Sequence, residues 1–137
     1  MKFSEEVYKI CGILEELKLT DIVACNTEKL PNPVDFYVIA TATSSLQGKA
    51  ALQNLIEQIE KEDLFTVLNQ DKFNTTEWFV ADLGKGFVHI FLQEAREKYN
   101  LEKLINEGNN VKKFEKLKKD YEKEKVKLEK LKKKSKN

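Results

Sequence analysis

The sequence contains few of the residues from which metal sites, disulfide frameworks and nucleophilic triads are built. Its 137 residues include one His, two Cys and one Met. Cys11 and Cys25 lie in apolar settings without C-x-x-C spacing, which favours buried thiols over a disulfide or zinc ligands. A glycine-rich phosphate loop is also missing. We therefore predict no enzymatic activity, no cofactor and no metal.

Long hydrophobic runs are missing as well. No apolar stretch approaches the ~18 to 20 residues that cross a membrane. The first thirty residues carry carboxylates, unlike a basic signal or transit peptide. These acids include Glu5, Glu6, Glu15, Glu16 and Asp21. We therefore predict a cytoplasmic protein without a membrane partner.

The net charge of +1 conceals two parts of opposite sign. Residues 1–108 hold 11 basic and 18 acidic groups, whereas residues 109–137 hold 13 Lys and five acids. The net charges are therefore −7 and +8, respectively. Because the length suits one compact domain plus an appendage, we predict a domain at 1–108 and a basic tail at 109–137.

Hydrophobic periodicity predicts a helix-strand-strand-helix-strand-strand-helix order within residues 1–108. The predicted strands lie at residues 21–26, 36–41, 78–83 and 87–92. The first predicted helix begins after Ser4. The second begins after Thr43–Ser45 and ends near Glu62, and the third covers 94–105. Residues 63–76 are predicted to form a loop with at most a short strand at 65–68. This order predicts an α/β fold, a small mixed β-sheet with packed helices.

The segments at 78–83 and 87–92 flank Gly84-Lys85-Gly86 and predict a hairpin whose side chains alternate between two faces. One face holds the apolar residues Phe79, Ala81, Val88 and Ile90 and is predicted to lie in the core. The other face holds Trp78, Val80, Asp82, Phe87, His89 and Phe91. Aromatic side chains mixed with polar groups are typical of a partly exposed binding surface. The alternative is that helices cover both faces and that Asp82 hydrogen-bonds His89.

Several separated segments carry a resemblance to a known family. They are 34–45 (VDFYVIATATSS), 77–84 (EWFVADLG), 88–91 (VHIF) and 99–104 (YNLEKL), together with Gln47, Glu94 and Arg96. In this order they resemble the ribosomal silencing factors, also called the Iojap family. The resemblance implies a small mixed-sheet domain of nucleotidyltransferase-like topology that lacks nucleotidyltransferase chemistry.

The resemblance also implies a function. The factor would bind the large ribosomal subunit at its fourteenth protein on the intersubunit face, block joining of the small subunit and repress translation under nutrient limitation. The partner-binding residues predicted from it are Trp78, Asp82, Phe87, His89, Phe91, Arg96 and Tyr99. Arg96, the only arginine, is expected to tie the last helix to Asp82 or to contact the partner. An aromatic sheet face also predicts a homodimer.

Four positions depart from the pattern of the family. They are Ala42 in place of Gly, Leu46 in place of Arg, Lys85 in place of Asp and Ile105 in place of Trp. The Lys85 change alters the charge beside the proposed contact face. None of the four removes Trp78, Asp82 or His89 from the predicted site.

A nucleotidyltransferase-like nucleotide-binding protein is the alternative function. Ser44 and Ser45 resemble the phosphate-binding turn of those enzymes, at a helix N-terminus that could hold an anion. That chemistry also needs paired carboxylates for magnesium, and the following strands offer Asp82 without an Asp-x-Asp pair. Helix capping is therefore the favoured role for these serines.

The lysine-rich tail predicts a helix from Val111 onward. Its apolar residues have heptad-like spacing, interrupted by Glu124: Phe114, Leu117, Tyr121, Leu128 and Leu131. We predict that its lysines contact ribosomal RNA. The alternative is a solvated helix without a partner.

Overall fold

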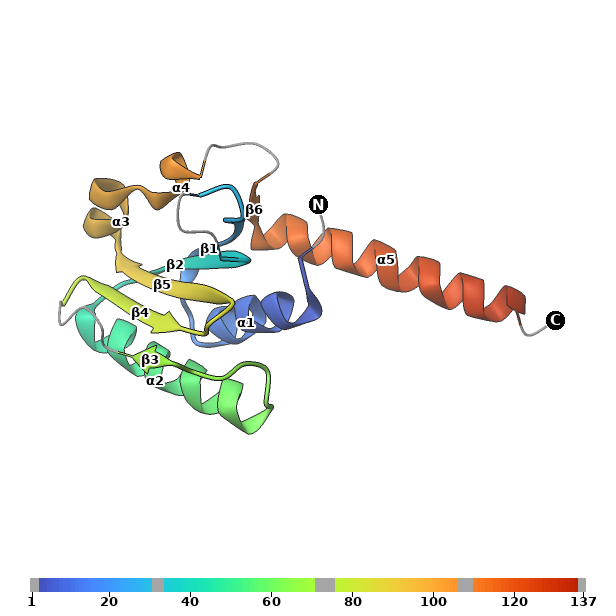
Figure 1. Cartoon of the computed structure of the whole chain (residues 1–137), viewed down its shortest axis with the longest axis horizontal. Coiled ribbons are helices and arrows are strands. Elements are labelled where there is room, and N and C mark those ends of the chain that lie inside the picture. The colour runs from blue at the N-terminus through green and yellow to red at the C-terminus, as the bar shows by residue number, and fades with distance from the viewer. Residues whose placement is uncertain (1–2, 31–33, 71–75, 106–109, 136–137) are drawn as a thin grey trace.

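The computed structural model describes residues 3–30, 34–70, 76–105 and 110–135. Its elements are α1 (Glu5–Glu16), β1 (Thr20–Asn26), β2 (Phe36–Ala42), α2 (Ser45–Lys61), β3 (Asn69–Gln70), β4 (Trp78–Asp82), β5 (Gly86–Leu92), α3 (Gln93–Tyr99), α4 (Leu101–Leu104), β6 (Val111–Lys113) and α5 (Phe114–Ser135). Figure 1 shows their arrangement. No helix in these ranges is long and apolar enough to cross a membrane.

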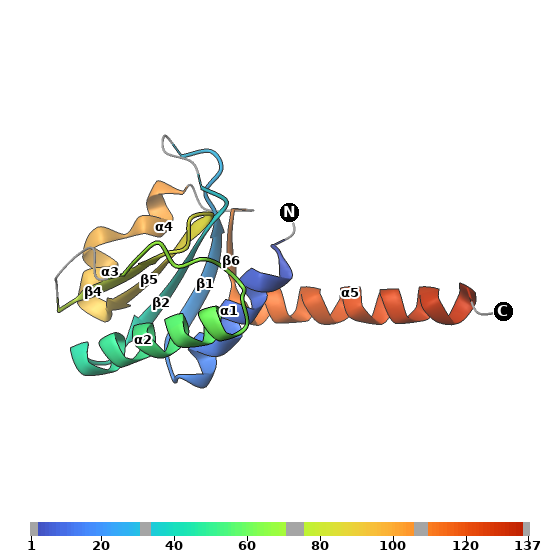
Figure 2. The same cartoon turned by 60° about the horizontal axis from the view of Figure 1, so that its bottom comes forward.

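The strands form one sheet in the order β3-β4-β5-β2-β1-β6. β2 and β5 are parallel, and the other neighbouring strands are antiparallel. Helices α1 and α2 lie on one face of the sheet, and α3 and α4 lie on the other (Figures 1 and 2). The predicted α/β fold with a mixed sheet is therefore confirmed.

Serine hydroxyls cap the two helices on the first face. Ser4 Oγ accepts a hydrogen bond from the backbone N–H of Val7 at 3.3 Å. Ser44 Oγ accepts one from the N–H of Gln47 at 3.1 Å. Each bond satisfies a backbone donor that the first helical turn leaves free. The capping role predicted for Ser44 is confirmed.

The β4–β5 hairpin has the predicted register. Its paired residues are Trp78 with Phe91, Val80 with His89, and Asp82 with Phe87. Gly84 has a φ of +77°, and its N–H donates to the carboxylate of Asp82 at 2.9 Å. Glycine suits this turn because it adopts a positive φ without steric cost. Gly86 is needed for space, since a Cβ there would lie 2.6 Å from the ring of Phe36.

Three elements differ from the predictions. The short strand is β3 at Asn69–Gln70, where it pairs with β4, so the strand at 65–68 is wrong. Residues 71–75 of the predicted loop lie outside the described residues. The helix at 94–105 is divided into α3 and α4 because Asn100 adopts a left-handed conformation (φ 42°). The unpredicted strand β6 pairs with β1 at the sheet edge.

The tail forms a helix as predicted, but the helix begins at Phe114 instead of Val111, because residues 111–113 pair with β1 as β6. The first turns of the helix pack on the domain. Phe114 and Leu117 are buried in the core between the sheet and α1. The ring of Tyr121 stacks on Tyr8 with centroids 4.2 Å apart. Beyond these contacts α5 extends away from the rest of the fold (Figures 1 and 2). Packing against the domain therefore continues past the change of charge at residue 108.

Candidate functional site

The second face of the sheet is only partly covered. Near its centre lies a small apolar cluster of buried residues, Val23, Cys25, Ile39, Phe91, Ala95 and Ile105. Towards β4 the cover ends, and aromatic side chains become accessible. We call the following six residues the aromatic face: Tyr37, Trp78, Phe87, His89, Phe91 and Tyr99. Among them Tyr37, Trp78 and Phe87 are half-buried, and Tyr99 is 42% exposed.

The rings of the aromatic face form a continuous run. Trp78 contacts Phe91 and Tyr99, with centroid separations of 4.9 and 4.7 Å. Tyr37 lies 4.7 Å from His89 and 5.9 Å from Phe87, in both cases edge to face. Such pairs stabilise a rigid surface beyond the effect of area burial alone. The run crosses β4, β5 and β2 and ends on α3.

His89 is buried within this run and supports Trp78. The indole Nε1–H of Trp78 donates to His89 Nδ1 at 3.0 Å. This bond assigns the imidazole proton to Nε2, which is buried without a partner among the described residues. The predicted alternative bond between Asp82 and His89 is wrong, because the carboxylate of Asp82 accepts from Gly84 in the turn.

Burial keeps His89 neutral. It lowers the pKa of the imidazole to about 3, because the protonated form would lose its hydration. In the unfolded chain the pKa is near its ordinary value of 6.5. Between these values the unfolded chain binds a proton that the folded chain does not. The free energy of unfolding is therefore expected to be about 1.4 kcal/mol lower at pH 5.5 than at pH 7.5 from this group alone.

A His89→Gln variant isolates this effect in denaturant titrations at both pH values. Glutamine provides an acceptor for the indole N–H but does not titrate. Since the chain has one histidine, the difference between wild type and variant reports His89 alone. An equal pH dependence in the two proteins would show that the imidazole protonates in the folded state.

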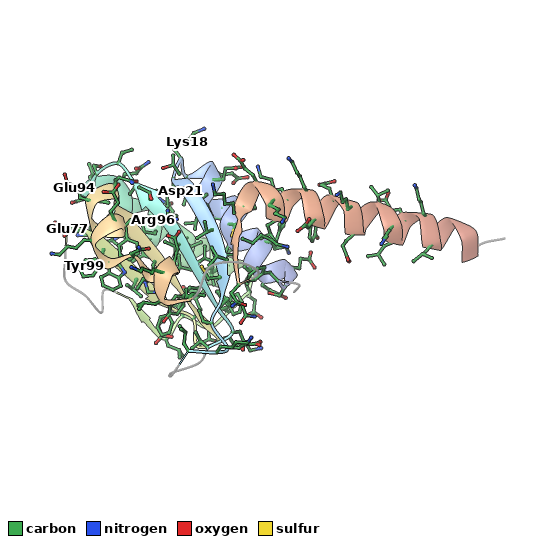
Figure 3. The ribbon with its side chains drawn as sticks, turned by 90° about the horizontal axis from the view of Figure 1, so that it is seen from above. Lys18, Asp21, Glu77, Glu94, Arg96 and Tyr99 are labelled. Atoms are coloured by element: carbon green, nitrogen blue, oxygen red, sulfur yellow. The ribbon has the colours of Figure 1, made fainter. Side chains whose placement is uncertain are left out.

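Arg96 lies at the opposite end of the strands from Asp82. Its guanidinium donates to Thr41 Oγ1 at 2.8 Å, to Glu102 at 2.9 Å and to the carbonyl of Asp21. The carboxylate of Asp21 lies 3.6 Å away (Figure 3). The predicted tie to Asp82 is wrong, because α3 begins where β5 ends, whereas Asp82 pairs with the start of β5. Arg96 instead fixes α3, and with it Tyr99, on the sheet.

Most of the predicted site residues lie together, and one contributor was missed. Trp78, Phe87 and Tyr99 lie on one surface, with Asp82 beside Phe87 at its rim, whereas His89 and Phe91 are buried beneath these rings. Arg96 lies beneath the surface, 7% exposed. The missed residue is Tyr37, which the parallel pairing of β2 and β5 places beside Phe87. The available signal was the spacing of two residues between Tyr37 and Ile39, which places both side chains on the same face of β2.

The positions that depart from the family pattern have separate environments. Ile105 is buried in the cluster beside the aromatic face, and Ala42 is buried at the end of β2. Leu46 is 80% exposed on α2, on the other side of the sheet. Lys85 is exposed in the hairpin turn. The two exposed positions are therefore free of packing constraints.

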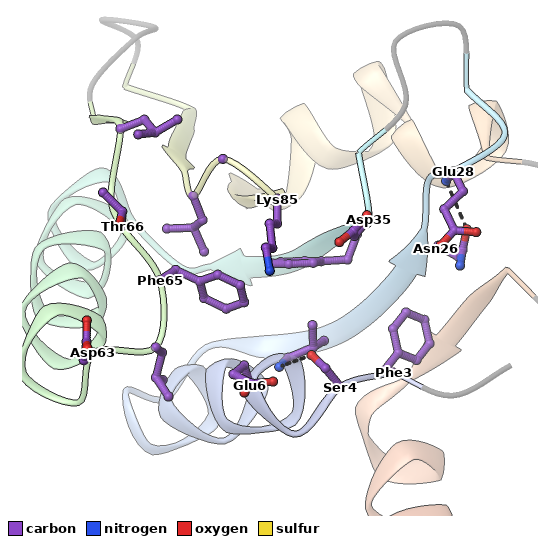
Figure 4. Close-up of a pocket in the computed structure, with 16 residues that line it drawn as sticks. Phe3, Ser4, Glu6, Asn26, Glu28, Asp35, Asp63, Phe65, Thr66 and Lys85 are labelled. Atoms are coloured by element: carbon purple, nitrogen blue, oxygen red, sulfur yellow. Dashed lines mark hydrogen bonds between the residues drawn. The ribbon is translucent and has the colours of Figure 1, made fainter.

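A pocket of about 700 Å³ lies away from the aromatic face, between the start of α1, the segment 63–68 and the hairpin turn (Figure 4). Its acidic lining residues are Glu6, Glu28, Asp35 and Asp63, and Lys85 is the one basic group among the lining residues that the structure describes. Such a lining repels phosphate. The described residues contain no group of three His, Cys, Asp or Glu that could hold a metal ion. The nucleotide-binding alternative therefore gains no support from this pocket.

These features define an α/β domain with an aromatic cluster partly exposed on one face of its sheet. A model of the family described as ribosomal silencing factor during starvation matches residues 1–137. The chain belongs to this family. Its members are ribosome-binding translation regulators and not enzymes.

Individual relatives agree with the assignment. The ribosomal silencing factor of Haemophilus influenzae is 42% identical over 91 residues, which are 66% of this chain and 88% of that protein. The chloroplastic Iojap protein of Zea mays is 30% identical over 96 residues, 70% of this chain and 41% of that protein. A crystal structure from Chromobacterium violaceum has a TM-score of 0.69 and 27% identity, and the match covers 80% of this chain and 90% of that one.

Proposed function

We propose that this protein binds the large ribosomal subunit at its fourteenth protein, on the intersubunit face, in the cytoplasm. Bound there, it blocks joining of the small subunit and represses translation under nutrient limitation. The aromatic face is the observation that supports this choice of binding site. The family assignment supports the ribosome as the partner.

The aromatic face has the composition of an interface anchor. Large rings such as Trp78 and Tyr99 bury much area on binding while losing little side-chain entropy. They rest on β4, β5 and α3, so their positions are set before the partner arrives. Asp82 and Glu77 supply polar groups at the ends of β4, as in the rim of a typical interface.

Ribosome assembly provides the direct test. We expect the protein to bind isolated large subunits and to lower the light scattering produced when small subunits are added. Tyr99→Ala should weaken this inhibition, because it removes an exposed ring that contacts Trp78. Leu46→Ala is the matched control, since it truncates an exposed apolar side chain on α2. Unchanged formation of joined ribosomes at saturating wild-type protein would refute the proposal.

A homodimer is expected in the absence of ribosomes. An accessible aromatic surface on a small domain favours self-association, and binding to the large subunit would then compete with it. Sedimentation velocity at high micromolar concentration should show a dimer that Tyr99→Ala weakens. A monomer under these conditions would contradict this expectation.

A further inference from the structure

Lysines recur along one side of α5. Their spacing is three, four, four and three residues, which places them on one face of a helix. We call these residues the lysine face: Lys116, Lys119, Lys123, Lys127 and Lys130. At 1.5 Å per residue the lysine face extends for about 21 Å, with a cation every ~4.5 to 6 Å.

The lysine face points away from the domain. All five of its side chains are exposed. The opposite side of the helix makes the contacts with the domain, through buried Leu117 and through Tyr121, which stacks on Tyr8. In its distal part, α5 has no other element of the described chain beside it (Figure 3). A long ligand could therefore lie along the lysine face without displacing any packed group.

The charges of the lysine face are available for a ligand. None of its five ammonium groups forms an ion pair with a residue that the structure describes. The neighbouring acid Asp120 is held by Lys112 of β6, and this hydrogen bond lowers the pKa of the carboxyl, with smaller contributions from the charges of Lys116 and Lys123. Lys118 is paired with Glu15 at 3.0 Å, on the side of α5 that faces α1.

The chemistry of the lysine face favours an extended polyanion. Residues 1–108 carry a net charge of −7 and would repel such a ligand, so α5 must hold it clear of the domain. A membrane surface fits poorly, because that mode needs a broad apolar face. The distal part of α5 offers Leu128 and Leu131, with the acidic Glu124 and Glu129 nearby. A nucleic acid backbone, with phosphates at regular intervals, matches a row of evenly spaced cations.

We propose that the lysine face binds the phosphate backbone of duplex ribosomal RNA beside the site occupied by the aromatic face. The choice of ribosomal RNA rests on the proposed function. The aromatic face would then supply protein recognition, and α5 would supply salt-dependent affinity that is independent of sequence.

Two variants of equal charge test this proposal. In the face variant all five residues of the lysine face are changed to glutamine, which keeps a high helix propensity. In the control variant five exposed lysines of the domain are changed to glutamine: Lys9, Lys29, Lys49, Lys61 and Lys103. Each variant loses five positive charges. Far-UV circular dichroism and thermal melts should confirm that both are folded.

Affinity is measured by fluorescence anisotropy with a labelled 20-base-pair RNA duplex, and by co-sedimentation with large subunits, over a range of salt. The face variant should bind the duplex roughly tenfold or more weakly than wild type at low salt. Its slope of log affinity against log salt should shrink by as much as ~4.5, or 0.9 per lysine lost. The control variant should keep most of the wild-type affinity and slope.

The outcomes separate this inference from the proposed function. Equal duplex binding by the two variants would overturn the role of the lysine face. Equally tight binding of anionic lipid vesicles or polyglutamate would also overturn it, because the face would then not select nucleic acid. If the duplex results are as expected but neither the wild type nor either variant binds large subunits, the lysine face binds RNA and the proposed function is wrong.

Discussion

Phe79→Ala is expected to lower the free energy of unfolding by about 3 to 5 kcal/mol. The ring is 7% exposed and packs against α2. The contact is close, since a Cβ added at Gly48 would lie 2.6 Å from the ring. Removing the ring therefore leaves a cavity between β4 and α2. Denaturant titration measures the loss, and binding to large subunits should fall only through the unfolded fraction.

Asp82→Ala, on the other side of the same strand, should behave in the opposite way. Its carboxylate accepts a hydrogen bond in the Gly84 turn, so the loss of stability should remain under ~1 kcal/mol. Binding to large subunits should weaken by about 1 to 3 kcal/mol, as for a truncated interface residue. Asp82→Asn is the matched control, because it preserves the turn acceptor and removes the charge. Unfolding as severe as that of Phe79→Ala would contradict the assignment of two faces.

Arg96→Met is expected to cost about 2 to 4 kcal/mol of stability. Methionine replaces the aliphatic part of the side chain but leaves Thr41 Oγ1 and the carbonyl of Asp21 without their donor. The Thr41 hydroxyl is buried, and an unpaired buried polar group is costly. The variant should also weaken ribosome binding, because α3 carries Tyr99 and would lose its attachment to the sheet.

Lys98→Met is the matched control for Arg96→Met. It removes a positive charge from the same helix, but the residue is exposed. Its effect on unfolding should stay within ~0.5 kcal/mol. Thermal and denaturant unfolding of both variants give the comparison. A loss below ~1 kcal/mol for Arg96→Met would show that the packing of α3 does not depend on this network.

Local signals in the sequence predicted most of the elements. The caps at Ser4 and Ser44, the alternation in the hairpin and the turn at Gly84 depend on residues close together in the chain. The short strands β3 and β6 were not predicted at their positions. A pair such as Asn69–Gln70 has no periodicity of its own, and it becomes a strand only because β4 offers an edge.

The sequence predicted which residues of the candidate site share one face of the sheet, but not which of them are buried. Alternation placed Trp78 and His89 on one face, yet it could not show that His89 is buried and accepts the indole N–H. Nor could it place Tyr37, which reaches Phe87 through a parallel pairing of distant strands. The burial of a side chain and its hydrogen-bond partners depend on which segments cover the sheet, and hydrophobic periodicity does not contain that information.

The sequence by itself determined the order of the main elements, the division of charge at residue 108, the two faces of the hairpin and the motifs of the family. Only the tertiary structure decided the partners of Arg96, which lie 75 and 55 residues away at Asp21 and Thr41. It also decided which of the α5 lysines with described side chains are exposed and form no ion pair with a described residue. The physical reason is the range of the interactions. Caps, turns and alternation act over a few residues, whereas burial and ion pairing depend on contacts that exist only once distant strands and helices have packed together.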